Sequence, residues 1–553
     1  MRALLFCAVV VVLTACPEPQ VRVDGGAAVE LDSGAPPPDA GTDVDAGTDG
    51  DAGTPVDAGT QLDAGTVTWS PCPLRSDGAN STLAECTTLR VPLRATEPSG
   101  PTLEYFIKRY RPPNGRALRA LWMLQGGPGA SGQIFDGIAE LFATRFPDVE
   151  FYIPDHRGTG RSSRLSCPEQ ESRASAQGLY ITADEWPACL AAVQAEVGPA
   201  LAAYSMTNAA HDVGFAIDAT RKEGQPVFVY GVSYGSSLAH RYLQLFPNQA
   251  DGVVLDSIAP PGMSLYRQDE DSHEAARSYF EACAADTVCG AKLGPDVWAK
   301  AESLFARLKT GHCAAIARPE IPTHVLLRRV FGSLLMNPEF RGYVAPVVYR
   351  ADRCDARDVT ALRQFLAQVS GEPASVPLEH QLWGWVLSNN VLHSEFGETP
   401  RPTPMELAAI RERCVASRDI TEALEATLNW PVYALDAYAG QYAQTSTPML
   451  MLSGGLDPAT ILRKARALRP HFTGPNQTWV ELPTATHTTL FSSPYVNAIG
   501  ERRSCGTAML MGFIENPRSP VDTSCVARVE GIDWALPRTD VNLALFGSAN
   551  AWE

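Results

Sequence analysis

The sequence lacks the excess of positive charge that nucleic-acid binding requires, because its net charge at pH 7 is −17, from 45 Lys and Arg against 62 Asp and Glu. It also lacks a Gly-x-Gly-x-x-Gly motif that opens a helix after a strand, which is the signature of dinucleotide binding. No His or Cys pair in its core has the spacing of metal ligands. We therefore expect no nucleic-acid partner, no hydride-carrying cofactor and no metal.

Long apolar runs are also scarce. The amino-terminal stretch of residues 3–15 has thirteen residues, too few to cross a bilayer as a helix, and predicts a signal peptide over residues 1–16. Its end, Leu-Thr-Ala-Cys, resembles the lipobox of bacterial lipoproteins, in which Cys16 becomes the lipidated first residue. Pro17 after Cys16 favours anchoring in the outer membrane, and we expect the lipid to be the protein's only contact with the membrane. The alternative is an ordinary secretory signal that contains a cysteine.

Residues 17–66 have too few apolar side chains to form a hydrophobic core. Asp-Ala-Gly-Thr recurs every six residues from Asp39 to Asp63, and residues 24–66 hold ten acidic side chains but no Lys, Arg or aromatic residue. Such a segment buries too little apolar surface to offset its ordering entropy, and its charges repel one another. We expect a disordered acidic tether that holds a domain away from a membrane. Calcium binding is the alternative, but the repeat has no apolar position for a β-helix.

About 490 residues follow the tether, which is more than one hydrophobic core usually organises. From residue 103 apolar strand segments alternate with helical segments, which predicts an α/β fold with a mostly parallel central sheet. We expect residues 67–259 to form the first part of this core and residues 443–553 its carboxyl-terminal part. Residues 260–442 are mostly helical in pattern and predict a large helical cap inserted between two strands.

Eleven cysteines follow Cys16. This abundance suits an oxidising compartment, where disulfides form and persist. Because the number is odd, at least one thiol must be free or paired elsewhere, and the sequence alone leaves the connectivity open.

The stretch VFVYGVSYGSSLAHRYLQLF, residues 227–246, places one serine between two glycines. The apolar residues before it predict a buried strand, and residues 236–246 predict a helix. Strand, sharp turn and helix are the context of a nucleophile elbow, in which Gly231 and Gly235 let the turn tighten and expose the Oγ of Ser233. The alternative is a glycine-rich turn with a serine that does no chemistry.

A serine hydroxyl needs an imidazole base, and the base needs a group that orients it. A nucleophile elbow indicates the α/β-hydrolase fold, in which these groups follow the chain order Ser, acid, His. Asp457 ends the first strand after the cap and is the candidate acid. Only His471 and His487 lie beyond it, and His487 follows the last strand at the edge where Ser233 lies, so we expect His487 to be the base. Asp256, which also ends a strand, is the rival acid.

The oxyanion that forms on attack needs backbone N–H donors positioned in advance. We expect one from Tyr234, the residue after the nucleophile. The other should come from Gly-Gly-Pro-Gly at residues 126–129, where small residues allow close approach of the backbone, with Gly127 as the candidate. Phosphate binding by this loop is a weak alternative, because no Lys followed by Ser or Thr continues it. Ser131 lacks the elbow context and is expected to be structural.

Together these segments resemble the α/β-hydrolase serine aminopeptidases, which include prolyl aminopeptidases and secreted tripeptidyl aminopeptidases. The resemblance extends from Trp69 to Cys525 and rests on GGPGASG, DHRGTGRSS, GVSYG and GGLDPAT. The closing CGTAMLMGFIENPRSPVDTSC resembles the carboxyl-terminal module of the tripeptidyl type. The resemblance implies four disulfides, namely Cys72–Cys86, Cys167–Cys189, Cys283–Cys289 and Cys505–Cys525.

The same resemblance implies cleavage from the free amino end of a peptide, so the cap must bind an ammonium group. NNVLHSEFGE is similar to the family's cap segment, which makes Glu395 the candidate through a charge-assisted hydrogen bond. A solvated surface glutamate is the alternative. His393 stands where the family more often has cysteine, and Thr486 precedes the candidate base where glycine is common.

We therefore expect a serine hydrolase, an exopeptidase that releases one or a few residues from a peptide through an acyl-enzyme on Ser233. An esterase is the alternative, because the same three side chains hydrolyse amides and esters alike. A non-catalytic surface-binding protein is a further alternative, against which the intact Ser233, Asp457 and His487 argue.

Overall fold

The computed structural model describes residues 67–75, 83–112, 114–172, 174–175, 180–318, 321–369 and 383–553. All of them belong to the compact unit that contains Ala64–Glu553. The expected signal peptide with Cys16 and the expected tether lie outside the described residues. Within the described ranges, no helix combines the length and apolar character needed to cross a bilayer.

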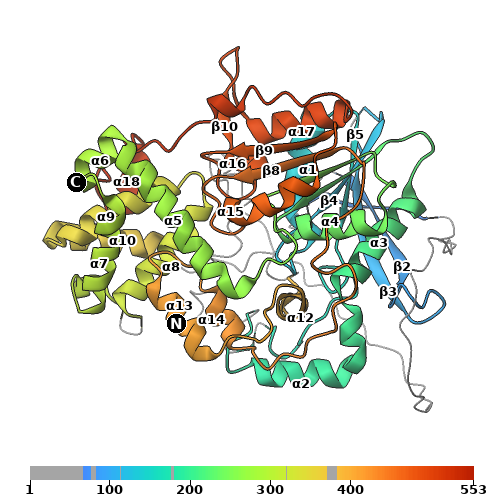
Figure 1. Cartoon of the computed structure of the whole chain (residues 1–553), viewed down its shortest axis with the longest axis horizontal. Coiled ribbons are helices and arrows are strands. Elements are labelled where there is room, and N and C mark those ends of the chain that lie inside the picture. Colours follow the sequence, from blue (N-terminus) through green and yellow to red (C-terminus); the bar gives the residue numbers. More distant parts are fainter. Residues whose placement is uncertain are drawn as a thin grey trace, which may run out of the picture. The chain divides into compact units, whose positions relative to one another are not determined.

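A nine-stranded sheet forms the centre of this unit, in the order β1-β2-β3-β5-β4-β6-β7-β8-β9 (Figure 1). The first strands pair antiparallel, and the strands from β5 across to β9 run parallel, which confirms the predicted mostly parallel sheet. The strands are β1 Ser70–Pro73, β2 Leu83–Pro92, β3 Thr102–Tyr110, β4 Arg119–Leu124, β5 Val149–Pro154, β6 Val227–Val232, β7 Gly252–Asp256, β8 Met449–Gly454 and β9 Gln477–Leu482.

The central strands are buried along their whole length, because helices cover the sheet. Every residue of β6, β7 and β8 is buried, as expected for parallel strands that are covered on both faces. Gly252 lets the sheet approach a covering helix, since a Cβ there would lie 2.9 Å from ring atoms of both Phe228 and Phe513. The helices of this part are α1 Asp136–Arg145, α2 Trp186–Glu196, α3 Met206–Thr220, α4 Tyr234–Leu245, α15 Leu462–Ala465, α16 Thr489–Ser492 and α17 Cys505–Glu515, and a small hairpin is formed by β10 Pro494–Val496 and β11 Arg502–Ser504.

The segment between β7 and β8 is helical, and Figure 1 shows these helices to the left of the sheet and below it. Most of them surround a second hydrophobic core. Of the remaining ones, α12 and α14 line the pocket described below, and α13 packs against α14. The helices between β7 and β8 are α5 Gln268–Ala285, α6 Thr287–Leu293, α7 Val297–Lys309, α8 Thr323–Met336, α9 Val344–Arg353, α10 Ala356–Val369, α12 Trp385–Glu395, α13 Pro404–Arg413 and α14 Ile420–Glu425.

The carboxyl terminus joins this second core rather than the sheet. Helix α18, Thr539–Phe546, packs against α10, where the rings of Phe365 and Phe546 stack 4.9 Å apart. Trp552 is buried in the same core, and Arg350 donates a hydrogen bond to the carbonyl of Ala551. This differs from the expected assignment of all of residues 443–553 to the sheet domain. The reason is that the last residues bury their apolar side chains among the inserted helices.

Five disulfides stabilise the described part of the chain. Four of them confirm the pairs implied by the resemblance, Cys72–Cys86, Cys167–Cys189, Cys283–Cys289 and Cys505–Cys525. The fifth joins Cys313 to Cys354, and Cys414 remains as a buried free thiol, which accounts for the odd number. Such a set of disulfides is typical of an extracellular protein.

Candidate active site

Ser233 occupies a strained turn between β6 and α4. Its φ of 57° and ψ of −126° are a conformation that a residue with a side chain rarely adopts. The neighbouring glycines make the turn possible, because a Cβ on Gly231 would lie 2.1 Å from the carbonyl oxygen of Gly235. A Cβ on Gly235 would lie 2.2 Å from the carbonyl oxygen of Leu124 in β4. The local sequence thus forms the elbow that its glycines predict.

His487 and Asp457 form a buried pair. The imidazole Nδ1 lies 2.8 Å and 3.0 Å from the two carboxylate oxygens of Asp457. That carboxylate also accepts hydrogen bonds from the backbone N–H groups of Ala459 and Thr460 and from the Thr460 hydroxyl. Burial raises the pKa of Asp457, but the charge of His487 and these hydrogen bonds outweigh burial and hold that pKa below its usual range. An ionised Asp457 orients His487 with its Nε2 free to accept a proton.

The segments of Ser233 and His487 are anchored to two consecutive residues at the end of β7. The N–H of Ser233 donates to the carbonyl of Asp256 at 3.0 Å, and the N–H of Thr488 donates to the Oγ of Ser257 at 2.7 Å. The strands that lead to these segments run parallel, so both segments leave the same edge of the sheet. Within the described residues no hydrogen bond joins the Ser233 Oγ to His487. Such catalytic contacts are often long without substrate.

The rival acid, Asp256, is fully buried and anchors the loop that carries the base. Its carboxylate accepts hydrogen bonds from the N–H and hydroxyl of Thr489, from the N–H of Leu490 and from the Tyr230 hydroxyl. Burial raises the pKa of Asp256, and these hydrogen bonds only partly oppose it. Asp256 therefore fixes the backbone after His487, whereas Asp457 contacts the imidazole.

The rival base, His471, lies elsewhere. It is exposed at the end of a short 3-10 helix, Arg466–His471, and its ring stacks on Tyr442 at 3.6 Å. It belongs to the segment between β8 and β9, where no hydrogen bond in the described part connects it to Asp457.

The glycine-rich loop after β4 packs directly on the nucleophile. A Cβ on Gly126 would lie 2.8 Å from the Cβ of Ser233 and 3.3 Å from its Oγ. In the described part of the chain, the backbone N–H groups of Gly127 and Tyr234 donate to no protein acceptor, and both residues line the same pocket as Ser233. The arrangement leaves two N–H groups for an oxyanion. Ser131, further along, donates instead to Asp155 and caps a 3-10 helix.

A cap residue supports this loop. The hydroxyl of Ser388 in α12 donates to the carbonyl of Pro128 at 2.5 Å and accepts a hydrogen bond from the Trp383 indole at 2.9 Å. The N–H of Gly384 donates to the carbonyl of Gly129 at 2.8 Å. These contacts fix the loop that carries the candidate oxyanion donor. No local sequence signal indicates them, because Ser388 and Pro128 are 260 residues apart.

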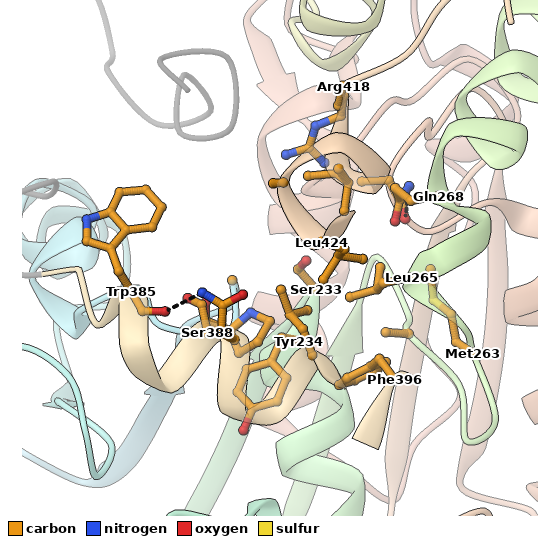
Figure 2. A pocket seen from close by; sticks show the side chains of 18 of the residues that line it. Ser233, Tyr234, Met263, Leu265, Gln268, Trp385, Ser388, Phe396, Arg418 and Leu424 are labelled. Carbon is orange, nitrogen blue, oxygen red and sulfur yellow. Dashed lines mark hydrogen bonds between the residues drawn. The ribbon is translucent and has the colours of Figure 1, made fainter. Parts of the chain in front are cut away.

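The pocket beside Ser233 has a volume of about 110 Å³ and apolar walls (Figure 2). Arg418 carries the only charged side chain among its described lining residues. No group of three or more His, Cys, Asp or Glu within the described residues could hold a metal ion. The apolar and aromatic lining residues include Trp186, Met263, Leu265, Trp383, Trp385, Leu392, Phe396, Ile420 and Leu424.

Glu395 does not line this pocket. It lines a neighbouring cavity of about 580 Å³, which shares Met263 and Phe396 with the pocket at Ser233. Its carboxylate is 5% exposed, accepts a hydrogen bond from the Tyr433 hydroxyl at 3.1 Å and pairs with Arg241 at 3.2 Å. The alternative of a solvated surface glutamate is therefore wrong. The expectation that Glu395 faces Ser233 is corrected in two respects. Glu395 lines the neighbouring cavity, and the buried Arg241 already pairs with its carboxylate.

The two residues that depart from the resembled family are structural. His393 is buried, with its Nδ1 2.6 Å from the Tyr266 hydroxyl and its Nε2 2.8 Å from Thr427. Burial lowers the pKa of His393 to about 3, so the ring is neutral and ties α12 to its neighbours. Thr486, next to the candidate base, donates its hydroxyl to the carbonyl of Leu335 at 2.6 Å.

The serine protease Hip1 of Mycobacterium bovis and of Mycobacterium tuberculosis is 27% identical to the chain over 267 residues, which are 44% of this chain and 49% of Hip1. The chain thus spans about half the length of the curated relatives it matches.

Solved structures with a similar fold include a proline iminopeptidase from Mycobacterium smegmatis, at 14% identity and a TM-score of 0.34 over 72% of this chain and 91% of that one. An esterase from Thermogutta terrifontis is similar at 13% identity and a TM-score of 0.30, with the same shares covered. A family model described as the alpha/beta hydrolase fold matches residues 119–289, which contain the elbow. With its sheet order and its elbow, the chain therefore has the α/β-hydrolase fold.

Proposed function

We propose that the chain is a serine hydrolase that cleaves peptides from their free amino end through an acyl-enzyme on Ser233. One observation carries the hydrolase part of this proposal. Ser233 stands in a strained elbow at the same sheet edge as the buried Asp457–His487 pair, with two N–H groups beside it that have no protein acceptor in the described part. This is the arrangement that acyl transfer by a serine requires.

In the first step the Ser233 Oγ attacks the substrate carbonyl carbon while His487 Nε2 takes the hydroxyl proton. The carbonyl oxygen becomes an oxyanion that accepts hydrogen bonds from the N–H groups of Gly127 and Tyr234. The carbon–nitrogen bond then breaks, and the leaving amine receives the proton from His487. In the second step a water gives a proton to His487 and attacks the acyl carbon. The bond from that carbon to the Ser233 Oγ then breaks, His487 returns the proton to the Oγ, and the acid leaves.

Two observations support a peptide as the substrate. The similarity to the serine protease Hip1 suggests this class, and the cavity that contains Glu395 adjoins the pocket across Met263 and Phe396. A peptide acyl group at Ser233 could extend its amino end into that cavity, where Glu395 would bind the ammonium. Because Arg241 already pairs with Glu395, we expect this contact to be weaker than one to an unpaired carboxylate.

An esterase is the second candidate, and the pocket lining favours it. No carboxylate lines the pocket at Ser233 among the described residues, and its walls are mostly apolar. Such a pocket suits a neutral acyl group as well as a peptide.

The test has two parts. A fluorophosphonate probe should label the wild-type protein and Ser519→Ala, an exposed serine in the loop after α17, but not Ser233→Ala. Labelling that persists in Ser233→Ala would contradict the assignment of the nucleophile. Alanyl 4-nitroanilide with a free amino group should then be hydrolysed at least about 10-fold faster than its N-acetyl form. Equal rates would favour the esterase, and Glu395→Gln should reduce the difference if Glu395 binds the ammonium.

A further inference from the structure

One hydrogen-bond acceptor in the wall of the pocket at Ser233 has no partner. Gln268, the first residue of α5, is 2% exposed and lines this pocket, and Figure 2 shows it in the wall to the right of Ser233. Its amide nitrogen donates to the backbone carbonyls of Pro458 and Ala459, both at 2.9 Å. Within the described part of the chain no donor reaches its amide oxygen, Oε1, and the protein does not enclose that oxygen. Because the rest of the residue is buried, Oε1 faces the pocket.

The orientation of this amide is fixed by its neighbours. An amide turned the other way would place Oε1 against two carbonyl oxygens, which repel it, so these contacts determine which atom faces the pocket. Pro458 and Ala459 directly follow Asp457, whose carboxylate accepts hydrogen bonds from the N–H groups of Ala459 and Thr460. The segment that holds Gln268 is thus itself held by the candidate acid. Oε1 is therefore an acceptor whose position is set before a substrate binds.

Other polar side chains of this wall already have partners. The Ser388 hydroxyl donates to the loop after β4. The amide oxygen of Asn389 accepts a hydrogen bond from the Thr427 hydroxyl at 2.9 Å, and the Thr460 hydroxyl donates to Asp457 at 2.8 Å. The rest of the wall is mostly apolar. An apolar group that fills this space would separate the unpartnered oxygen from water, which costs free energy unless the group supplies a donor.

We propose that Gln268 accepts a hydrogen bond from the substrate, so that the pocket selects an apolar group that carries a neutral N–H or O–H donor. This inference rests on the proposed function, because it names the substrate class of the same site. A neutral donor fits better than an ammonium group, because no carboxylate lines this pocket among the described residues and a buried charge needs a counter-charge. The donor has two sources in a peptide: the side chain of the acyl residue, or that of the first leaving residue.

The first arm compares acyl residues of similar shape with and without a side-chain donor. The pairs are the 4-nitroanilides of threonine and valine, of glutamine and methionine, and of tyrosine and phenylalanine. In at least one pair, wild type should hydrolyse the member with the donor at least about 10-fold more efficiently in kcat/KM. Gln268→Met should abolish this preference by lowering kcat/KM for the donor substrate alone, because it replaces the amide by an apolar group of similar length.

Ser272→Ala is the matched control. The Ser272 hydroxyl donates at 3.0 Å to the same Pro458 carbonyl that accepts from Gln268, and Ser272 does not line the pocket. This variant therefore removes a contact to the loop after Asp457 without changing the acceptor. Both members of a pair should respond to it alike, and their ratio should stay that of wild type. A ratio lost in Ser272→Ala as well as in Gln268→Met would assign the effect to the loop and overturn the inference.

The second arm places the same residues after the scissile bond. Alanyl dipeptide amides that end in threonine or valine, in glutamine or methionine, and in tyrosine or phenylalanine are compared, with the released alanine measured by mass. A donor preference that disappears in Gln268→Met assigns the donor to the leaving residue. A preference in the first arm alone assigns it to the acyl residue.

A binding measurement separates this inference from the proposed function. Indole carries one neutral N–H, and indene has a methylene group in its place. Indole should protect Ser233 of wild type from fluorophosphonate labelling at about 10-fold lower concentration than indene, and Gln268→Met should remove that difference. Labelling without any donor effect, in either hydrolysis arm or in protection, overturns the inference and leaves the hydrolase intact. Absence of Ser233 labelling contradicts the proposed function itself. If Gln268→Met does not fold, the wild-type ratios and the difference between indole and indene decide the question.

Discussion

The carboxyl ends of β7 and β8 each lead into a buried aspartate, and the two aspartates differ in what they hold. Asp457 faces the imidazole of His487, with the Thr460 hydroxyl and backbone N–H groups fixing its other lone pairs. Asp256 faces only hydroxyl and backbone donors, among them both donors of Thr489. A position at the end of a strand therefore does not by itself identify the candidate acid. What distinguishes the two aspartates is the set of donors around each carboxylate.

Their pKa values move in opposite directions for the same reason. Both carboxyl groups are buried, which disfavours ionisation, but only Asp457 adjoins an imidazole, that of His487, and this contact lowers its pKa. The pKa of Asp457 is lowered and that of Asp256 is raised. The following changes test this contrast.

The largest effect should come from Asp457→Asn. An amide cannot hold His487 in the tautomer that accepts the serine proton, so kcat should fall by about 10⁴-fold with little change in KM. Steady-state hydrolysis of a chromogenic substrate measures this loss, and circular dichroism checks that the fold is retained. A fall of less than about 10-fold would assign the orienting role to another group.

Asp256→Asn should act on stability more than on chemistry. The amide nitrogen must face at least one backbone N–H, of Thr489 or Leu490, which loses its acceptor in a buried site. One such unpaired donor costs about 1–3 kcal/mol. Denaturant unfolding should show that loss, while kcat falls by no more than about 10-fold because the carboxylate does not contact His487. A loss of kcat as large as that of Asp457→Asn, with unchanged stability, would reverse the two assignments.

The smallest effect is the pH dependence of the two stability losses. The lowered pKa of Asp457 gives stability that is present above its unfolded pKa, near 3.8, and is lost as the pH falls below it. The raised pKa of Asp256 gives stability that is fully present below 3.8 and is lost as the pH rises above it. Between pH 3 and 6 the destabilisation by Asp457→Asn should therefore grow with pH, and that by Asp256→Asn should shrink. The melting temperatures of wild type, Asp457→Asn and Asp256→Asn across this pH range measure how each destabilisation changes with pH. Changes of the same sign for the two variants would contradict the contrast.

The sequence predicts the parts of the site that follow strand order. The elbow around Ser233 is local, and the order Ser, acid, His then leaves few candidates, so the paired Asp457 and His487 could be named in advance. The contact of Ser388 with Pro128 could not, because it joins segments that are far apart in the chain and carry no motif. The pairing of Glu395 with Arg241 was missed for the same reason, since 154 residues separate them. Cap residues are placed by tertiary packing rather than by periodicity.

The hydrogen bond from Ser388 to Pro128 joins the inserted helices to the glycine-rich loop beside Ser233. A covering domain that only gated access could be removed, exchanged or swung aside while the chemistry below continued. Here such a movement would remove a hydrogen bond that supports the loop proposed to hold the oxyanion. Attempts to change the substrate selectivity of this protein should therefore substitute individual side chains that line the pocket. Replacing the whole set of inserted helices with that of another protein should lower kcat before it changes selectivity.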